Sequence, residues 1–178
     1  MRIRLANPQD HDALWRIIEP TARAGETWAL PRDWTRDAAL AFWLAPAMET
    51  WVADRDGQVV GTYFIRPAQL GPGSHVANAG YMVLPSAWGS GVASAMCLHS
   101  LKRAEERGFR AMQFNFVVST NQRAVELWKR LGFSIIGCSP GAYHHPTRGF
   151  VDALIMHRVI GEASGSGSDR PSGASEWP

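Results

Sequence analysis

The stretch that decides the fold runs from residue 83 to residue 94 and reads VLPSAWGSGVAS. An apolar run stops at Pro85, a turn with Gly89 and Gly91 follows, and a helical period begins at once. The first N–H groups of a helix have no partner inside it, and the helix dipole adds about half a positive charge there. Glycine lets an anion approach the backbone without a Cβ in the way. The stretch therefore predicts either an anion cradle or an ordinary tight turn between a strand and a helix.

The segments around this turn predict alternating strands and helices. A strand from 76 to 84 precedes it, and the helix after it carries an apolar stripe (Met96, Cys97, Ser100, Leu101, Ala104) and stops at Gly108. A strand at 111–118, a helix at 121–131 and a strand at 133–136 follow. Before it come a strand at 3–5, a helix opened by Asn7-Pro8, a second helical region within 21–44, and strands at 50–53 and 59–65 joined by an Asp-Gly turn. A loop at 139–149 and a strand at 150–156 end the pattern. The order predicts an α/β fold with a mixed central sheet of about seven strands flanked by about four helices.

Composition narrows the class of protein. The chain has 178 residues, 46% of them hydrophobic and 19% charged, with a net charge of +2. One domain at 1–160 is expected, followed by a disordered Gly/Ser-rich tail at 161–178. No apolar run approaches the about 20 residues of a membrane span, and no basic cluster is long enough to follow a phosphate backbone. We therefore expect a cytoplasmic protein with no membrane or nucleic-acid partner.

Tryptophan is the unusual residue of this chain. Eight are present, and five of them fall within the first 51 residues (Trp15, Trp28, Trp34, Trp43, Trp51). Tryptophan offers a large apolar face and one N–H, which suits a core as well as a pocket wall. The early tryptophans are expected to pack the N-terminal helices over a cleft, in either of those two roles.

Two motifs together carry a resemblance to a known family. The loop Trp88-Gly89-Ser90-Gly91-Val92-Ala93 matches the pattern Gln/Arg-x-x-Gly-x-Gly/Ala except at its first position. The run from Asn121 to Phe133 matches Asn-x-x-Ala-x-x-x-Tyr-x-x-x-Gly-Phe, with Trp128 in place of the tyrosine. Over residues 1–160 the chain resembles the GNAT superfamily of N-acetyltransferases. The stretches GTYFIRP at 61–67 and SHVANAG at 74–80, with Phe114-Asn115 and Thr120-Asn121-Gln122, look like those of the azetidine-2-carboxylate acetyltransferases, which acetylate proline analogues.

The resemblance implies acetyl-CoA as the co-substrate, with no metal. The backbone of Val83 would pair with the pantetheine arm, and Asn121 would contact its thioester end. The remaining residues expected to contact the co-substrate are Met82, Trp88, Gly89, Ser90, Gly91, Val92, Ala93, Ser94 and Trp128. An indole cannot give up a proton as tyrosine can, so Trp128 would pack on the co-substrate, and Tyr81 is the nearest alternative acid.

Asn78 and Asn115 are the expected catalytic and acceptor-binding residues, together with Tyr81 and His75 as further acceptor contacts. An asparagine offers an acceptor for an amine and a donor for a carboxylate or oxyanion, although it is not a base. The alternative is that each asparagine satisfies backbone groups at an irregularity of the sheet. His75 is otherwise a structural donor in its loop. What would bind a substrate carboxylate is open, with Arg66 and Arg32 as candidates.

Other reactive side chains fit the chemistry less well. His144 and His145 are neighbours in the expected 139–149 loop and do not share a face, so they make a poor metal site. Cys97 lies on the apolar helix stripe and is expected in the core, and Cys138 has no activating histidine, so a thiol nucleophile is not expected.

The resemblance implies an enzyme that transfers acetyl directly, in a ternary complex, to the amine of a small amino-acid-like molecule. Azetidine-2-carboxylate or another proline analogue would be such a molecule, which implies detoxification of amino-acid analogues. A homodimer is common in the family. The alternatives are acetylation of another amine, such as an antibiotic or a protein N-terminus, and a non-catalytic acyl-CoA-binding module, which the missing tyrosine and the missing Gln/Arg at Trp88 would fit.

Overall fold

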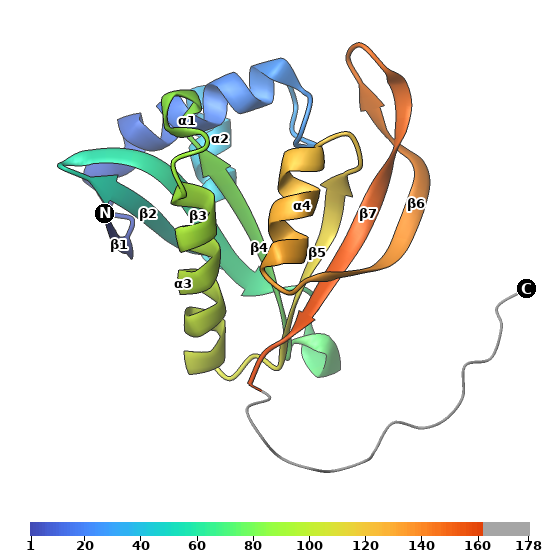
Figure 1. Cartoon of the computed structure of the whole chain (residues 1–178). Helices are drawn as coiled ribbons and strands as arrows, with labels where there is room; N and C mark the ends of the chain where they lie inside the picture. The colour runs from blue at the N-terminus through green and yellow to red at the C-terminus, as the bar shows by residue number, and fades with distance from the viewer. Residues whose placement is uncertain (162–178) are drawn as a thin grey trace, which may run out of the picture.

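The computed structural model describes residues 1–161 and shows one seven-stranded sheet with helices on both faces (Figure 1). The strands are β1 (Arg2–Leu5), β2 (Glu49–Arg55), β3 (Gln58–Pro67), β4 (Val76–Val83), β5 (Ala111–Val118), β6 (Ser134–His145) and β7 (Gly149–Val159). The helices are α1 (His11–Ala24), α2 (Arg36–Trp43), α3 (Val92–Glu106) and α4 (Gln122–Arg130), with three short 3-10 turns, η1 (Pro8–Asp10), η2 (Gly71–Gly73) and η3 (Pro85–Ala87). The expected disordered tail lies, from residue 162 on, outside the described residues.

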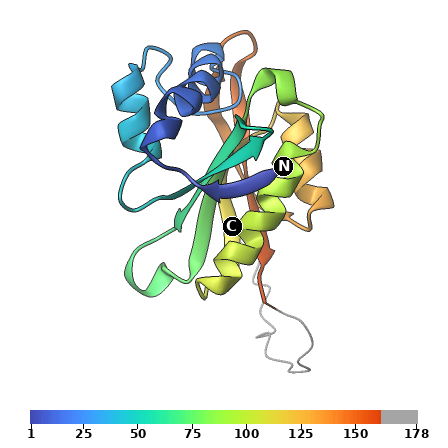
Figure 2. The same ribbon diagram turned by 90° about the vertical axis from the view of Figure 1, so that its left-hand side faces the viewer.

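The order of elements and the mixed sheet confirm the predicted fold class. The strands lie in the order β1-β2-β3-β4-β5-β7-β6, and every neighbouring pair is antiparallel except β4 and β5, which run parallel. Figure 2 shows α1 and α2 on one face of the sheet and α3 and α4 on the other. The parallel pair therefore lies in the middle of the sheet, covered on both faces.

Each face of the sheet has its own apolar core. Leu14, Ile17, Trp43 and Phe64 are among the buried residues beneath α1 and α2. On the other face, α3 lies so close to the sheet that a Cβ on Gly61 would be 2.8 Å from Cγ1 of Val92. Cys97 is fully buried in this second core, as its helix stripe predicted.

The start of the chain folds as its sequence predicts. The Asn7 side chain accepts a hydrogen bond from the Gln9 N–H at 2.9 Å, and the Asp10 carboxylate accepts one from the Asn7 N–H at 2.8 Å. This reciprocal capping satisfies donors that the helix leaves open. Asp10 also forms a two-pronged ion pair with Arg4, and that contact holds the pKa of Asp10 below its usual value. The pair fixes β1 to the helical start.

One sequence prediction of secondary structure was wrong, and a second was correct only in part. The loop expected at 139–149 is mostly strand, because β6 continues to His145 and turns tightly into β7. Strand β6 lies at the edge of the sheet with a register irregularity between Ser139 and Tyr143, where Pro140 and Gly141 are tolerated without loss of a central ladder. The helical region expected within 21–44 is interrupted, because Gly25 ends α1 in the left-handed conformation (φ 62°) and α2 begins only at Arg36.

The early tryptophans divide between the two expected roles. Trp43 is fully buried and its indole N–H donates to the Thr62 hydroxyl at 3.0 Å. Trp28 packs against Trp43 and Phe64, with ring centroids 5.4 and 6.4 Å away, while its far edge reaches over β4. A Cβ on Gly80 would lie 2.3 Å from Cη2 of Trp28. The indole therefore occupies the space that any larger residue at position 80 would need.

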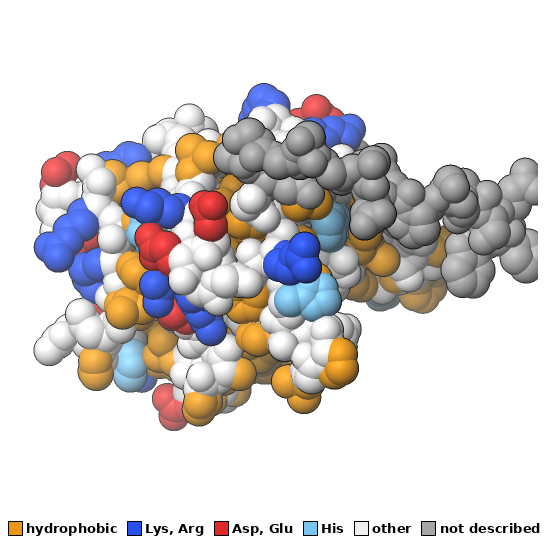
Figure 3. Space-filling view, turned by 90° about the horizontal axis from the view of Figure 1, so that it is seen from below, with side chains coloured by type: hydrophobic (Ala, Val, Ile, Leu, Met, Phe, Trp, Pro, Cys, Tyr) orange, Lys and Arg blue, Asp and Glu red, His pale blue; other side chains and the backbone are white. Residues whose placement is uncertain are grey.

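Charge on the face at the lower end of Figure 1 is mixed. Figure 3 shows basic and acidic side chains interspersed there rather than gathered by sign. At the C-terminal end of α3, Arg103 pairs with Glu49 at 2.7 Å and Arg107 with the same carboxylate at 3.5 Å. These contacts hold α3 to β2. Within the described residues, no helix has the length and apolar character needed to cross a membrane.

The contact between Trp28 and Gly80 predicts a selective loss of stability. Gly80→Ala should lower the free energy of unfolding by about 1–3 kcal/mol, because the new methyl group overlaps the indole and the Phe64 ring. Urea unfolding followed by circular dichroism measures the change. Gly137→Ala is the matched control, since its Cβ would meet only the movable end of Ile155 at 3.3 Å and should change stability by less than about 0.5 kcal/mol. Equal effects of the two variants would contradict this account.

Candidate active site

The site is created where β4 and β5 separate. The two strands pair at Val76–Ala111 and Ala77–Met112 only, and their ribbons then diverge (Figure 1). Asn78 marks the last link, because its side-chain amide donates to the Gln113 carbonyl at 2.8 Å. Beyond this link the inner edges of both strands carry backbone groups without a strand to pair with.

A bulge in β5 opens the sheet on the other side of the gap. The register of β5 against β7 shifts between Phe114 and Val117, so that Asn115 and Phe116 together lie opposite the single residue Ile155 of β7. Both are exposed. A bulge bends its strand and increases the local twist, which directs β5 away from β4.

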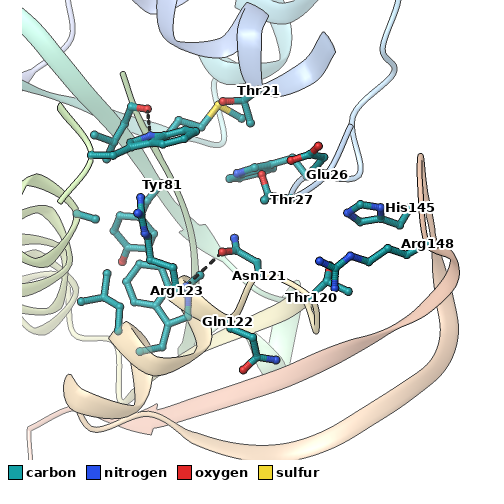
Figure 4. Close-up of a pocket in the computed structure, with 18 of the residues that line it drawn as sticks. Thr21, Glu26, Thr27, Tyr81, Thr120, Asn121, Gln122, Arg123, His145 and Arg148 are labelled. Atoms are coloured by element: carbon teal, nitrogen blue, oxygen red, sulfur yellow. Dashed lines mark hydrogen bonds between the residues drawn. The ribbon is translucent and has the colours of Figure 1, made fainter. Parts of the chain in front are cut away.

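The larger cavity, of about 540 Å³, follows this gap, and we call it the splay groove. It is bounded by Met82 and Val83 of β4, by Trp88 and Ala93 at the start of α3, and by Asn121 and Trp128 of α4. Figure 4 shows Glu26 and Thr27 across the groove from Thr120 and Asn121, with His145 and Arg148 at one side. Asn121 caps α4, its side-chain oxygen accepting from the Ala124 N–H at 3.2 Å.

The turn before α3 has the backbone conformation expected of an anion cradle. Gly89 and Gly91 have φ of 76° and 81°, and a Cβ on either would meet no atom within 4 Å. The first intrahelical bond of α3 runs from the Ala95 N–H to the Gly91 carbonyl, which leaves the N–H groups of Val92, Ala93 and Ser94 without a helical partner. Gly91 is thus placed where an anion could approach the helix start directly.

Trp88 lies between this turn and the exposed edge of β4. The Leu84 N–H donates to Val60 of β3 at 2.9 Å, so the alternation of the strand points the backbone of Val83 into the gap. The Trp88 indole N–H donates to the Val83 carbonyl at 2.9 Å, and the Arg123 guanidinium lies 5.6 Å from the indole centroid. Trp88 therefore contacts the backbone group that was predicted to pair with pantetheine.

A second cavity, of about 330 Å³, opens on the α1/α2 face, and we call it the aromatic cavity. Its walls include Trp28, Phe42, Phe64, Phe114 and Phe116, and its polar side chains include Arg66, Asn78 and Asn115. The two cavities share lining residues, among them Tyr81, Asn121, Ala124 and Trp128. A molecule in the aromatic cavity would therefore share these side chains with a molecule in the splay groove.

The hydroxyl of Tyr81 forms hydrogen bonds beneath α3. It lies 2.6 Å from the Ser100 hydroxyl and 3.5 Å from the sulfur of Met112, while its ring packs 5.0 Å from Trp128. Burial raises the pKa of Tyr81 well above its usual value. The ring is a wall of both cavities, and the proton of the hydroxyl is held on the α3 side.

The structure brings most of the predicted site residues together, with exceptions. Asn78 and Asn115 both line the aromatic cavity, although the Asn78 amide nitrogen is used by the sheet, as the structural alternative predicted, and the Asn115 oxygen accepts from Gln113 at 2.7 Å. His75 lines neither cavity, because it lies at the opposite end of β4, with Nδ1 3.0 Å from the Pro72 carbonyl. Val92 is buried beneath the turn, so only its backbone can contact a ligand.

Strand β6 contacts the segment that carries Trp28. The Tyr143 hydroxyl lies 2.7 Å from the Gly25 carbonyl and 3.0 Å from the Trp28 carbonyl, and burial raises the pKa of Tyr143. His145, expected in a loop, is buried in β6 and lines the splay groove, whereas His144 is exposed and packs on Phe150. No group of three metal-binding side chains occurs within residues 1–161.

Sequence reasoning did not assign Thr27, Arg123 or Arg148 to the site, yet all three line the splay groove. Arg123 had a usable signal, because it lies inside the Asn121 motif. Arg148 and Thr27 had none, since each comes from a turn far away in the sequence.

Comparison with known proteins shows which family the sequence matches. The model of the acetyltransferase (GNAT) family matches residues 11–133. N-acetyltransferase aca1 of Schizosaccharomyces pombe is 33% identical over 112 residues, 62% of this chain and 54% of that protein, so the chain spans about half the length of this relative.

Solved structures show the same fold over nearly the whole described chain. A GCN5-related N-acetyltransferase from Kribbella flavida is 42% identical with a TM-score of 0.85, covering 89% of this chain and 97% of that one. A GNAT superfamily phosphinothricin acetyltransferase from Sinorhizobium meliloti, solved in complex with acetyl-CoA, is 20% identical with a TM-score of 0.80, covering 94% and 93%.

The two cysteines predict a simple labelling pattern. Cys97 is fully buried and burial raises its pKa to about 12, whereas Cys138 is exposed. An aromatic disulfide reagent should modify one thiol per folded chain, and Cys138→Ser should abolish that reaction. Partial desolvation and the nearby Asp152 carboxylate raise the pKa of Cys138, so the rate should increase with pH across the alkaline range. Labelling of two thiols in the folded protein would contradict this prediction.

Proposed function

This chain belongs to the acetyltransferase (GNAT) family, and on that premise we propose that it transfers the acetyl group of acetyl-CoA to the amine of a small amino-acid-like acceptor. A cyclic imino acid such as azetidine-2-carboxylate is the acceptor that fits best. The observation that carries the proposal is the junction of the two cavities, which share Tyr81, Asn121 and Trp128. A donor in one cavity and an acceptor in the other would meet at these residues.

The splay groove suits acetyl-CoA by its backbone chemistry. The free N–H groups at the start of α3 would bind the pyrophosphate, and glycine at 89 and 91 leaves room for its approach. The Val83 backbone would pair with the amides of pantetheine, as an added strand does. Arg123 and Arg148 add positive charge to the wall of the groove.

The aromatic cavity suits a small acceptor. Its volume of about 330 Å³ is at the lower end of small-molecule sites. The walls are mostly apolar and include seven aromatic rings, which favours a compact apolar ring over a highly charged polyamine.

Acetyl-CoA supplies an acyl carbon activated as a thioester, whose leaving thiol is acidic enough to depart as a thiolate. Transfer forms a C–N bond and breaks the C–S bond, and the amine proton passes to water or to the thiolate. The residues of the chain would bind and orient the acceptor: the Asn115 amide lies at the cavity wall, where it can donate to an oxygen or accept from the amine. Trp28 and Trp128 would exclude water from the junction, because both line it as large apolar faces.

Two other functions remain distinguishable by one experiment. Release of free thiol from acetyl-CoA is measured with cyclic imino acids, primary amino acids, aminoglycosides and an N-terminal peptide. Turnover confined to small amino acids supports the proposal, and turnover with the other amines contradicts it. Binding of acetyl-CoA without turnover of any amine would instead indicate a non-catalytic module. Cytoplasmic location, a homodimer and detoxification of amino-acid analogues stay predictions from the sequence.

Position 91 tests the cofactor assignment. Gly91→Glu should abolish detectable binding of acetyl-CoA in calorimetry, because it places a carboxylate at the predicted pyrophosphate cradle. Gly108→Glu is a closely matched control: Gly108 has φ of 77°, a Cβ there would also meet nothing within 4 Å, and it follows the opposite end of α3. Both variants introduce the same strain and charge. Equal affinity for acetyl-CoA in the two variants would show that the cradle is elsewhere.

Asn115 tests the acceptor assignment. Asn115→Ala should leave acetyl-CoA affinity unchanged and lower turnover of the acceptor by about 10-fold, the effect of losing one hydrogen bond of roughly 1.4 kcal/mol. Steady-state thiol release and calorimetry separate the two quantities. The side chain is exposed in the bulge, so the fold should survive the change. Unchanged turnover would exclude Asn115 from the acceptor site.

A further inference from the structure

Arg66 is the side chain of the aromatic cavity that the proposed transfer does not use. It lies near the end of β3 and lines the cavity together with Asn78, its partner across the β3–β4 ladder. Its Nε atom is buried and has no hydrogen-bond partner among residues 1–161. Few buried polar atoms in a folded protein lack a partner, and a charged group without one is costly. The unpartnered Nε atom therefore indicates that the Arg66 guanidinium is available to bind a ligand.

The surroundings of Arg66 contain no anion to neutralise it. Among the described residues that line the aromatic cavity, Arg66 alone carries a formal charge. Two other partly buried arginines are paired with carboxylates: Arg4 contacts Asp10 at 2.8 Å, and Arg103 contacts Glu49 at 2.7 Å. A guanidinium in an aromatic cavity favours a planar anion that can accept two parallel hydrogen bonds, and a carboxylate is such an anion.

Arg32, the other candidate for binding a carboxylate, makes its contacts away from both cavities. Its Nε donates to the Arg23 carbonyl at 2.9 Å, its side chain packs where a Cβ of Gly25 would be, and it lines neither cavity. The sequence offered Arg66 and Arg32 equally as candidates for binding a carboxylate, and in the structure only Arg66 of the two lines a cavity.

We propose that Arg66 binds the carboxylate of the acceptor and so selects amino acids and imino acids over amines that lack an acid group. This inference rests on the proposed function, because it assigns the acceptor to the aromatic cavity. The carboxylate would lie at the Arg66 end, and the amine would point toward Tyr81 and Trp128, which also line the splay groove. The same positive charge disfavours the ammonium form of a nearby amine, and so favours the neutral form that attacks.

The test compares L-azetidine-2-carboxylate with its carboxamide, which keeps the ring and the amine and removes the negative charge. The wild-type enzyme should prefer the acid by about 10- to 100-fold in kcat/KM, the value of a charged hydrogen-bonded contact. The amine of the amide is the less basic of the two, so a preference for the acid cannot arise from its neutral fraction.

Substitution of Arg66 should remove that preference. Arg66→Met should raise KM for the acid by about the same factor while kcat/KM for the amide changes little, and Arg66→Lys should restore part of the difference because it keeps the charge without the planar fork. Arg130→Met is the control, since Arg130 is an exposed arginine at the end of α4 that lines neither cavity. It should behave as the wild type on both substrates.

Each contrary result has a distinct meaning. Equal use of acid and amide by the wild type, an equal loss on both substrates in Arg66→Met, or a selective loss in Arg32→Met would each overturn the role of Arg66 while leaving acetyl transfer to small amines intact. Binding of acetyl-CoA with no transfer to any amine would overturn the proposed function as well. The wild-type comparison and Arg66→Lys decide the question even if Arg66→Met does not fold.

Discussion

The gap between β4 and β5 is the constraint on which the rest of the structure depends. Two backbone pairings and the Asn78 side chain hold the strands together at one end, and the bulge at Asn115 and Phe116 turns β5 away at the other. A parallel pair in the middle of a sheet would ordinarily be continuous, because unpaired backbone groups inside a protein are costly. Here the separation exposes the edge of β4 to one cavity and joins that cavity to a second. Both predicted asparagines lie where the separation is produced, so their structural and functional roles are not exclusive.

The two faces of the gap differ in chemistry, and the ligands proposed for the two cavities rest on that difference. The start of α3 offers backbone N–H groups and a glycine turn, with Arg123 and Arg148 on the walls of the same groove, which suits a phosphate-bearing molecule. The α1/α2 face offers aromatic rings and one guanidinium, which suits a small molecule with a single acid group. Trp28 links the faces, since it lines both cavities and rests on Gly80. The abundance of tryptophan at the start of the chain is thus part of the site as well as of the core.

The sequence was sufficient for the elements that obey a simple period and insufficient for contacts between distant segments. The stripe through Met96 and Leu101 predicted α3, and the Asn121 and Gly132 boundaries predicted α4. The start of β6 was predicted as a strand at 133–136, but its continuation to His145 was missed, because an exposed edge strand with Pro140 and Gly141 lacks an apolar alternation. The bond from Asn78 to Gln113 joins residues 35 positions apart, and no local pattern encodes it. The sequence offered Arg66 and Arg32 as equal candidates, whereas the fold places Arg66 at the wall of the aromatic cavity with its Nε atom buried and binds Arg32 to the Arg23 carbonyl.

The bond from Tyr143 to the carbonyls of Gly25 and Trp28 also has a consequence for the order of folding. It joins residues 118 and 115 positions apart, so a hydroxyl from the last hairpin of the sheet helps to hold the backbone of Trp28 near the N-terminus. Contacts of such long sequence separation form late, because the chain must first pay the entropy of closing a large loop. On a ribosome, Tyr143 leaves the tunnel after both motif helices. The residues of the glycine turn before α3 are therefore synthesised before the side chain that completes the hydrogen bonds to Gly25 and Trp28.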